Sequence, residues 1–281
     1  MLIASYAKIN LFLEVLGRLE NNYHRVNTVL CSIDFFDEIK YLLTDSGSLK
    51  IWSHIPELCG ADNLIYRIGS YLRERYAVSQ GADVRLCKEI PLAAGLGGGS
   101  SNAALSIIAF NQLWKLGLSP QEMHEIAALF GSDINFFLAG GTALGENRGE
   151  RITLLSDIVI DNILLVNPGI RISAGEAYGA TQLPAAGETK HFDPANPIAT
   201  MFNRLEAAVC KLYPIVGDTL HTLDDFGAAK SMLSGSGATC FGIFDDANGM
   251  ALCRSHFENK GYFTHETRTI SRSEYQKCFP S

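Results

Sequence analysis

The chain has 281 residues, of which 47% are hydrophobic and 19% are charged, as expected for a globular protein with one large domain or two ordinary ones. A net charge of −7 and the lack of a long basic run argue against a dedicated nucleic-acid binder. The seven cysteines form no C-x-x-C pair, which argues against a zinc ribbon or a dithiol redox centre.

The first residues show no signal-peptide pattern, and no apolar run reaches the roughly 18–20 residues that span a bilayer. An odd, scattered set of cysteines suits reduced thiols. We therefore expect a cytoplasmic protein with neither a membrane nor a nucleic-acid partner.

Alternating polar and apolar residues predict a strand over 3–16. Because successive side chains point to opposite faces, Lys8 and Asn10 project from the same side of this strand. A polar turn at 17–24 and a second strand over 26–33 predict a hairpin whose loop carries Tyr23 and His24. Further strands are expected between residues 35 and 53.

Helical spacing of apolar residues predicts a helix from Asn63 to Tyr76, with Asp62 or Asn63 as its N-cap. A strand over 82–88 then leads into a stretch rich in glycine. Four glycines fall within five residues there, and two serines follow: Gly95, Gly97, Gly98, Gly99, Ser100 and Ser101.

This glycine-rich stretch predicts a phosphate-binding loop. Glycine accepts positive φ angles and lets a ligand lie against the backbone, so several amide N–H groups can converge on one anion. An apolar helix is expected from about Ser101 to Lys115, and its N-terminus adds the positive end of the helix dipole. The loop is neither a P-loop, because no lysine precedes the serines, nor a Rossmann loop, because Ser100 holds the third glycine position. The protein-kinase motifs His-Arg-Asp and Asp-Phe-Gly are also absent from the sequence.

The capping box Ser119–Glu122 predicts a helix that ends at Gly131. Ser132 is expected to cap a short helix over 133–139, with Asp133 in its first turn, where the dipole favours an ionised carboxylate. Strands around a turn follow at 140–145 and 152–155.

The second half alternates helices with strands that read as antiparallel, which predicts a compact α+β unit. Strands are expected at 161–169, 230–233, 240–244 and 261–269, and helices near 197–213, 214–226 and 247–260. A loop is expected over 179–197, and a second loop of small residues lies at Ser234–Ala238.

These features occur in the order found in the GHMP small-molecule kinases, and the chain resembles that family over most of its length. The matching segments are 7–13, 23–24, 91–101, 131–133, 167–169 and 233–238. The resemblance implies an α+β, two-domain GHMP kinase fold. Residues 1–155 would form a domain like the second domain of ribosomal protein S5, and residues 156–281 a ferredoxin-like domain.

The resemblance also implies roles for individual residues. Lys8 and Asp133 match the catalytic pair, while Asn10, Tyr23 and His24 match substrate-binding positions, the last two serving a cytosine ring. Family spacing adds Tyr178 as the second stacking face for that ring. Asn63 is expected near the adenine of ATP, and the ATP phosphates are expected to meet Pro91, Leu92, Ala93, Ala94, Gly95, Leu96, Gly97, Gly98, Gly99, Ser100 and Ser101.

The members that match best phosphorylate the 2-hydroxyl of a cytidine diphosphate-linked methylerythritol, in non-mevalonate isoprenoid precursor synthesis. The resemblance therefore implies this small molecule as the substrate, ATP as the co-substrate and Mg²⁺ as the metal ion. The sequence itself shows no metal-ligand cluster. One alternative is a GHMP kinase for another alcohol, such as homoserine or mevalonate, which Tyr23 and His24 disfavour. Another is an inactive ligand-binding regulator, which Lys8 and Asp133 disfavour. The oligomeric state is left open.

Overall fold

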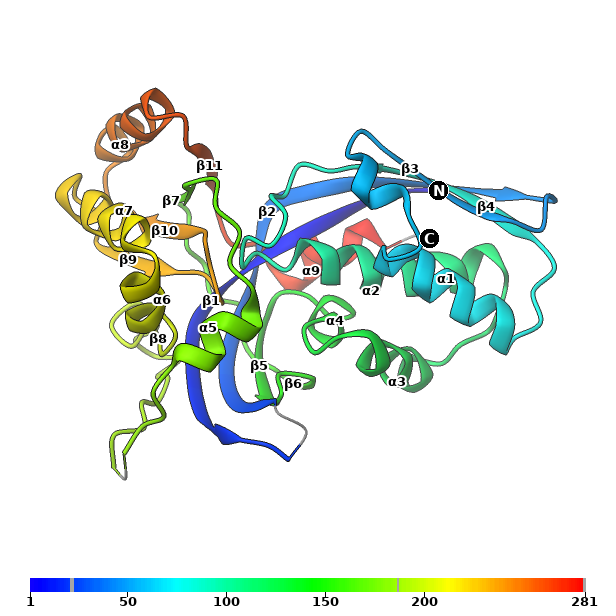
Figure 1. Ribbon diagram of the computed structural model, residues 1–281, viewed down its shortest axis with the longest axis horizontal. Helices are drawn as coiled ribbons and strands as arrows, with labels where there is room; N and C mark the ends of the chain where they lie inside the picture. The colour runs from blue at the N-terminus through cyan, green and yellow to red at the C-terminus, as the bar shows by residue number, and fades with distance from the viewer. Residues whose placement is uncertain (21–22, 186, 280–281) are drawn as a thin grey trace.

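The computed structural model describes residues 1–20, 23–185 and 187–279, and its strands form two sheets (Figure 1). The first sheet has the order β3-β4-β2-β1-β8, and β5 pairs with both β2 and β6. Its strands are β1 (Leu2–Arg18), β2 (His24–Thr44), β3 (Leu49–Ser53), β4 (Gly81–Cys87), β5 (Thr142–Asn147), β6 (Arg151–Leu154) and β8 (Phe202–Asn203). The second sheet is antiparallel and contains, in order, β11 (Phe263–Thr267), β7 (Ile163–Asn167), β10 (Cys240–Ile243) and β9 (Lys230–Leu233).

The long antiparallel pair β1–β2 confirms the predicted hairpin. Separate strands were expected after residue 33, but β2 continues as one strand of 21 residues. It pairs with β5 through residues 26–31 and with β4 through residues 38–44, so both of its ends have partners. Asn21 and Asn22 of the predicted turn lie outside the described residues.

Helices cover one face of each sheet (Figure 1). On the first sheet these are α1 (Leu64–Arg75), α2 (Gly98–Leu113), α3 (Pro120–Phe130) and α4 (Ile134–Phe137). On the second they are α6 (Glu206–Leu212), α7 (Pro214–Asp225) and α8 (Ala247–Asn259). The shorter elements are η1 (Pro56–Cys59), α5 (Ala174–Ala180), α9 (Arg272–Tyr275) and η2 (Gln276–Cys278). None of the helices in the described part of the chain is long and apolar enough to cross a membrane.

The helix after the glycine loop, α2, is buried on nearly all sides, as its composition predicted. Phe110 stacks on Trp114 with ring centroids 4.4 Å apart. Burying one large apolar side chain stabilises a fold by about 1.5–3 kcal/mol. The loop therefore rests on a rigid part of the core.

Two of the three predicted N-caps, Ser119 and Asn63, are confirmed. Ser119 Oγ accepts from the backbone N–H of Glu122, whose carboxylate accepts from the N–H of Ser119 at 2.8 Å. Asn63 Oδ1 accepts from the N–H of Ile65 at 2.9 Å. These bonds satisfy donors that the first turn of a helix otherwise leaves unpaired.

The helix predicted over 197–213 is wrong in its first half, because α6 begins only at Glu206 and β8 precedes it. The side chain of Asn203 donates to the carbonyl oxygens of Leu233 and Gly235, both at 2.8 Å, and this holds the segment extended beside β1.

Two short helices, α5 and α9, were not predicted. Each begins after a capping serine with a glutamate three residues later, Ser173 with Glu176 and Ser271 with Glu274. Runs of seven and four residues carry too little apolar periodicity to reveal a helix. β8 and α9 both follow residue 156 in the chain, yet β8 pairs with β1 and Tyr275 of α9 lies in the core beneath the first sheet. The domain boundary near residue 155 therefore stays a prediction.

Candidate active site

The glycine loop enters α2 at Gly98, three residues earlier than predicted. Its N-cap, Gly97, has a φ of +69°, and no side chain of the described residues caps this helix. The N–H groups of the first turn are therefore left for an anion, at the positive end of the dipole. A Cβ at Gly97 would lie 2.7 Å from the ring of Phe137, so the loop packs directly against α4.

The second small-residue loop lies against the first. Ser234 Oγ donates to the carbonyl oxygen of Gly95 at 3.0 Å, and the N–H of Thr239 donates to that of Ala94 at 3.2 Å. A Cβ at Gly95 would lie 2.0 Å from the carbonyl oxygen of Ser234. Only glycine permits this approach, so two loops far apart in sequence form one wall of the site.

Lys8 is 3% exposed and its ammonium makes two hydrogen bonds. It donates to the carbonyl oxygen of Gly95 at 2.8 Å and to Asn10 Oδ1 at 2.5 Å. Asn10 Nδ2 donates in turn to Thr28 Oγ1 at 2.8 Å, so its amide orients the lysine. Burial lowers the pKa of Lys8, and the nearby Asp133 carboxylate partly opposes this shift.

Asp133 lies opposite Lys8, with 3.9 Å between the carboxylate Oδ2 and the ammonium nitrogen. The expectation that Ser132 caps α4 was wrong, because Asp133 is itself the N-cap residue and has helical dihedral angles. Its side chain makes no capping bond among the described residues. The side chain is 39% exposed, so its carboxylate can accept a proton from a bound ligand.

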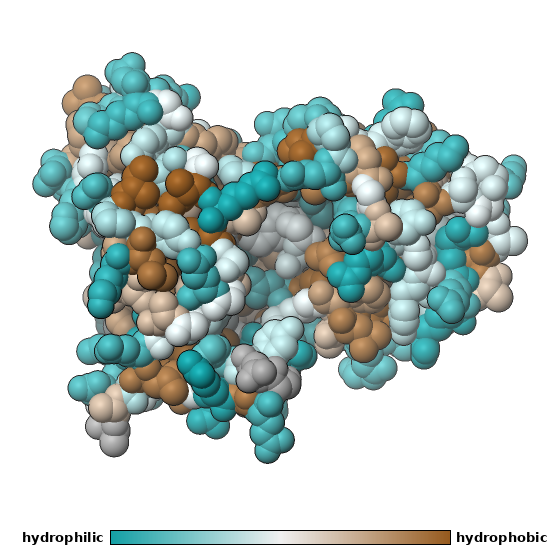
Figure 2. Space-filling model, viewed as in Figure 1, coloured by the Kyte–Doolittle hydropathy of each residue, from teal (hydrophilic) through white to brown (hydrophobic). Residues whose placement is uncertain are grey.

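A cavity of about 600 Å³ connects these groups, within the range of small-molecule sites. It opens where the surface is hollowed between the two sheets and their helices (Figure 2). It brings together nine of the predicted site residues: Lys8, Asn10, Tyr23, His24, Gly95, Gly97, Ser100, Asp133 and Tyr178.

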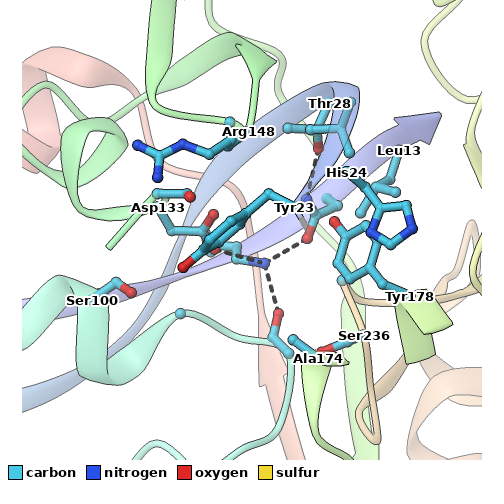
Figure 3. A pocket seen from close by; sticks show the side chains of 18 of the residues that line it. Leu13, Tyr23, His24, Thr28, Ser100, Asp133, Arg148, Ala174, Tyr178 and Ser236 are labelled. Atoms are coloured by element: carbon cyan, nitrogen blue, oxygen red, sulfur yellow. Dashed lines mark hydrogen bonds and ion pairs between the residues drawn. The ribbon is translucent and has the colours of Figure 1, made fainter. Parts of the chain in front are cut away.

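His24 and Tyr178 lie on the side of the cavity away from Asp133 (Figure 3). Their rings stack with centroids 5.2 Å apart and planes at 24°. Burial, and secondarily the charge of Arg18, lower the pKa of His24 and favour its neutral form. His24 Nε2 is buried and has no hydrogen-bond partner among the described residues. The stacked rings therefore give this end of the cavity a flat aromatic wall.

Arg148 was not identified from the sequence. Its guanidinium lies 5.1 Å from the ring centroid of Tyr23, and both side chains line the cavity. The hairpin tip that carries it is fixed to α4, because Asn135 Nδ2 donates to the carbonyl oxygen of Glu150 at 3.0 Å. A single arginine in a polar turn gives no sequence signal, and only its contact with Tyr23 reveals its place.

The other residues predicted to bind ATP do not line this cavity. Asn63 uses its amide within its own segment, since Nδ2 donates to the carbonyl oxygen of Leu58 at 2.7 Å. The hydroxyl of Ser101 is buried and accepts from Ser5 Oγ at 2.8 Å. ATP contacts remain predictions for Asn63, Pro91, Leu92, Ala93, Ala94, Leu96, Gly98, Gly99 and Ser101.

Within the described ranges, no cluster of three or more His, Cys, Asp or Glu side chains could hold a metal ion. Mg²⁺ commonly takes only one or two protein carboxylates and completes its shell with water and substrate phosphates. The carboxylate of Asp133 and the hydroxyl of Ser100 line the cavity and are oxygen donors of the kind that Mg²⁺ accepts.

Two family models match the chain, GHMP kinases N terminal domain over residues 63–141 and GHMP kinases C terminal over residues 184–261. This chain belongs to the GHMP kinase family, as its motifs predicted. A 4-diphosphocytidyl-2-C-methyl-D-erythritol kinase from Pelotomaculum thermopropionicum is 38% identical over 94% of this chain and 96% of its own length. A relative of the same name from Caldanaerobacter subterraneus is 36% identical over 93% of both chains.

Solved structures confirm the predicted two-domain GHMP kinase fold. A 4-(cytidine 5'-diphospho)-2C-methyl-D-erythritol kinase has a TM-score of 0.83 at 26% identity, covering 96% of this chain and all 100% of that one. A mevalonate kinase has a TM-score of 0.71 at 12% identity, covering 96% of this chain and 99% of its own. The second likeness concerns the fold alone.

Proposed function

We propose that this protein transfers the γ-phosphoryl group of ATP to the 2-hydroxyl of 4-diphosphocytidyl-2-C-methyl-D-erythritol, in non-mevalonate isoprenoid precursor synthesis. The observation that carries the proposal is a single cavity lined by the glycine loop, the Lys8–Asp133 pair and the His24–Tyr178 stack. Relatives of that name, at 36–38% identity over nearly the whole chain, support the same acceptor.

The glycine loop would bind the ATP phosphates, and the cytosine of the acceptor would lie by His24. The acceptor hydroxyl then reaches Asp133. As its oxygen bonds to the γ-phosphorus, the bond to the β–γ bridging oxygen breaks, ADP leaves, and the hydroxyl proton passes to the Asp133 carboxylate. Lys8 stabilises the negative charge on the transferred group. Phosphoryl transfer depends mainly on positioning and charge neutralisation, which these residues supply.

Mg²⁺ would neutralise charge on the ATP phosphates, and Asp133 and Ser100 are the residues best placed to meet it from the protein side. We further propose that the reaction takes place in the cytoplasm, where ATP is abundant and the seven unpaired cysteines stay reduced.

A coupled ADP-release assay with purified protein, Mg²⁺ and a panel of alcohols tests the assignment. The diphosphocytidyl acceptor should give the highest kcat/KM, well above homoserine and mevalonate. Preference for either of the other two would identify a different GHMP kinase. Binding of the acceptor without ATP consumption would identify a regulator.

A further inference from the structure

A chain of buried hydrogen bonds runs beneath the glycine loop. Asn102 Nδ2 donates to Ser5 Oγ at 2.9 Å, and Ser5 Oγ donates to Ser101 Oγ at 2.8 Å. The hydroxyl of Tyr275 donates to the carbonyl oxygen of Phe137 at 2.7 Å, and the Phe137 ring packs against Gly97, where a Cβ would lie 2.7 Å from it. Apart from Gly97, none of these residues is more than 4% exposed. Phe137 therefore connects the hydroxyl of Tyr275 to Gly97, the N-cap of α2.

The same chain extends to the segment that enters the loop. Asn102 Nδ2 also donates to Asp37 Oδ2 at 2.9 Å, and Lys88 Nζ lies 2.7 Å from that oxygen. Asp37 Oδ1 accepts from the N–H groups of Glu89 and Ile90, at 2.8 and 2.9 Å. The residues directly before Pro91 are thus held by the same network.

Tyr275 lies in α9, near the end of the described chain, and its hydroxyl contacts the end of α4 through Phe137. Its ring fills a space that Gly140 leaves open, since a Cβ there would lie 2.1 Å from the ring. The ring also packs near Tyr6 and Phe279, with centroids 5.7 and 5.8 Å away. Packing therefore holds the ring in place without the hydroxyl. A Tyr275→Phe substitution should remove the hydrogen bond and keep the packing.

We propose that Tyr275 is a positioning residue for phosphoryl transfer, whose hydroxyl fixes the first turn of α2 relative to α4. The first turn of α2 contributes Ser100 to the cavity lining, and α4 follows directly on Asp133. This inference rests on the proposed phosphoryl transfer in this cavity. A misplacement of about 1 Å between reacting groups can lower the rate about 100-fold. A contact that holds α2 and α4 in place relative to each other should therefore affect kcat.

The test compares Tyr275→Phe with Tyr41→Phe. The hydroxyl of Tyr41 is equally buried and lies 2.7 Å from Ser106 Oγ, on the same helix α2 but away from the loop and α4. Each variant loses one buried hydroxyl, so their Tm values should fall by similar amounts. We expect kcat of Tyr275→Phe to be at least about tenfold below that of Tyr41→Phe. Values of kcat within twofold of each other, at matched Tm, would overturn the proposal.

A double-mutant cycle gives a second test. If Phe137→Leu and Tyr275→Phe disturb the same contact between α4 and the glycine loop, the kcat of the double variant should fall little below that of the lower single variant. If the fold-losses in kcat of the two single variants multiply fully in the double variant, the two side chains act independently and the linkage is overturned.

The two proposals can fail separately. If the wild-type protein does not phosphorylate the diphosphocytidyl acceptor, the proposed function fails. The kcat values of Tyr275→Phe and Tyr41→Phe are then measured with the acceptor in the panel that reacts best. If no acceptor reacts, ATP affinity from calorimetry replaces kcat, and the same comparison of Tyr275→Phe with Tyr41→Phe decides.

Discussion

The ammonium of Lys8 lies 3.9 Å from the carboxylate of Asp133 and also donates to the carbonyl oxygen of Gly95 at 2.8 Å. One buried cation thus joins the proposed proton acceptor to the loop proposed to hold the ATP phosphates. Because Asn10 holds the same ammonium from β1, the three parts of the site are positioned together.

Replacing Asp133 with asparagine should abolish most turnover while leaving ATP binding intact. The amide keeps the shape of the carboxylate but cannot accept the hydroxyl proton, and a positioned base contributes about 10²–10⁴ in rate. Steady-state kinetics and calorimetry with ATP measure the two effects. Asp45→Asn, in an exposed turn, is the control. Retention of more than about a tenth of wild-type kcat would remove Asp133 from this role.

Replacing Gly97 with alanine should weaken ATP binding at least about tenfold, because the backbone there has positive φ and the added Cβ meets the Phe137 ring at 2.7 Å. Gly117→Ala is the matched control, since Gly117 has a φ of +70° but no atom lies within 4 Å of the position that its Cβ would take. Calorimetry with ATP decides between them. Equal affinities in the two variants would mean that loop geometry is not what binds ATP.

Replacing Arg148 with methionine should raise the KM for the acceptor at least about tenfold and change that for ATP little, since a charge-assisted contact contributes about 1.5–3 kcal/mol. The acceptor carries a diphosphate, and Arg148 lies over Tyr23 beside Asp133 (Figure 3). Arg151→Met, at an exposed position of β6, is the control. A selective rise in the KM for ATP would instead assign Arg148 to the nucleotide.

Stability should depend on pH through His24. Burial lowers its pKa in the folded protein, so between that pKa and about 6.5 the unfolded chain binds the extra proton and the folded protein does not. The free energy of unfolding should therefore rise with pH across this window, and the rise should be smaller in His24→Gln. Urea unfolding of both proteins at several pH values measures this difference. Identical pH profiles would show that His24 titrates normally.

The sequence predicted the parts of the site that follow from local chemistry. The density of glycine around Gly97 indicated a phosphate loop, and strand alternation placed Lys8 beside Asn10. Arg148 and Tyr275 carry no such local signal, because their places depend on contacts formed only when distant segments pack. The start of α4 was misassigned for a related reason, since Ser132 and Asp133 are both residues that cap helices well.

The most direct measurement of the central claim is a ³¹P NMR spectrum of the reaction with ATP, Mg²⁺ and the diphosphocytidyl acceptor. The account predicts ADP together with one new phosphomonoester signal on the acceptor, whose diphosphate signals persist, and at least about 100-fold slower product formation by Asp133→Asn. Release of inorganic phosphate without a new phosphomonoester, or equal product from Asp133→Asn, would contradict it.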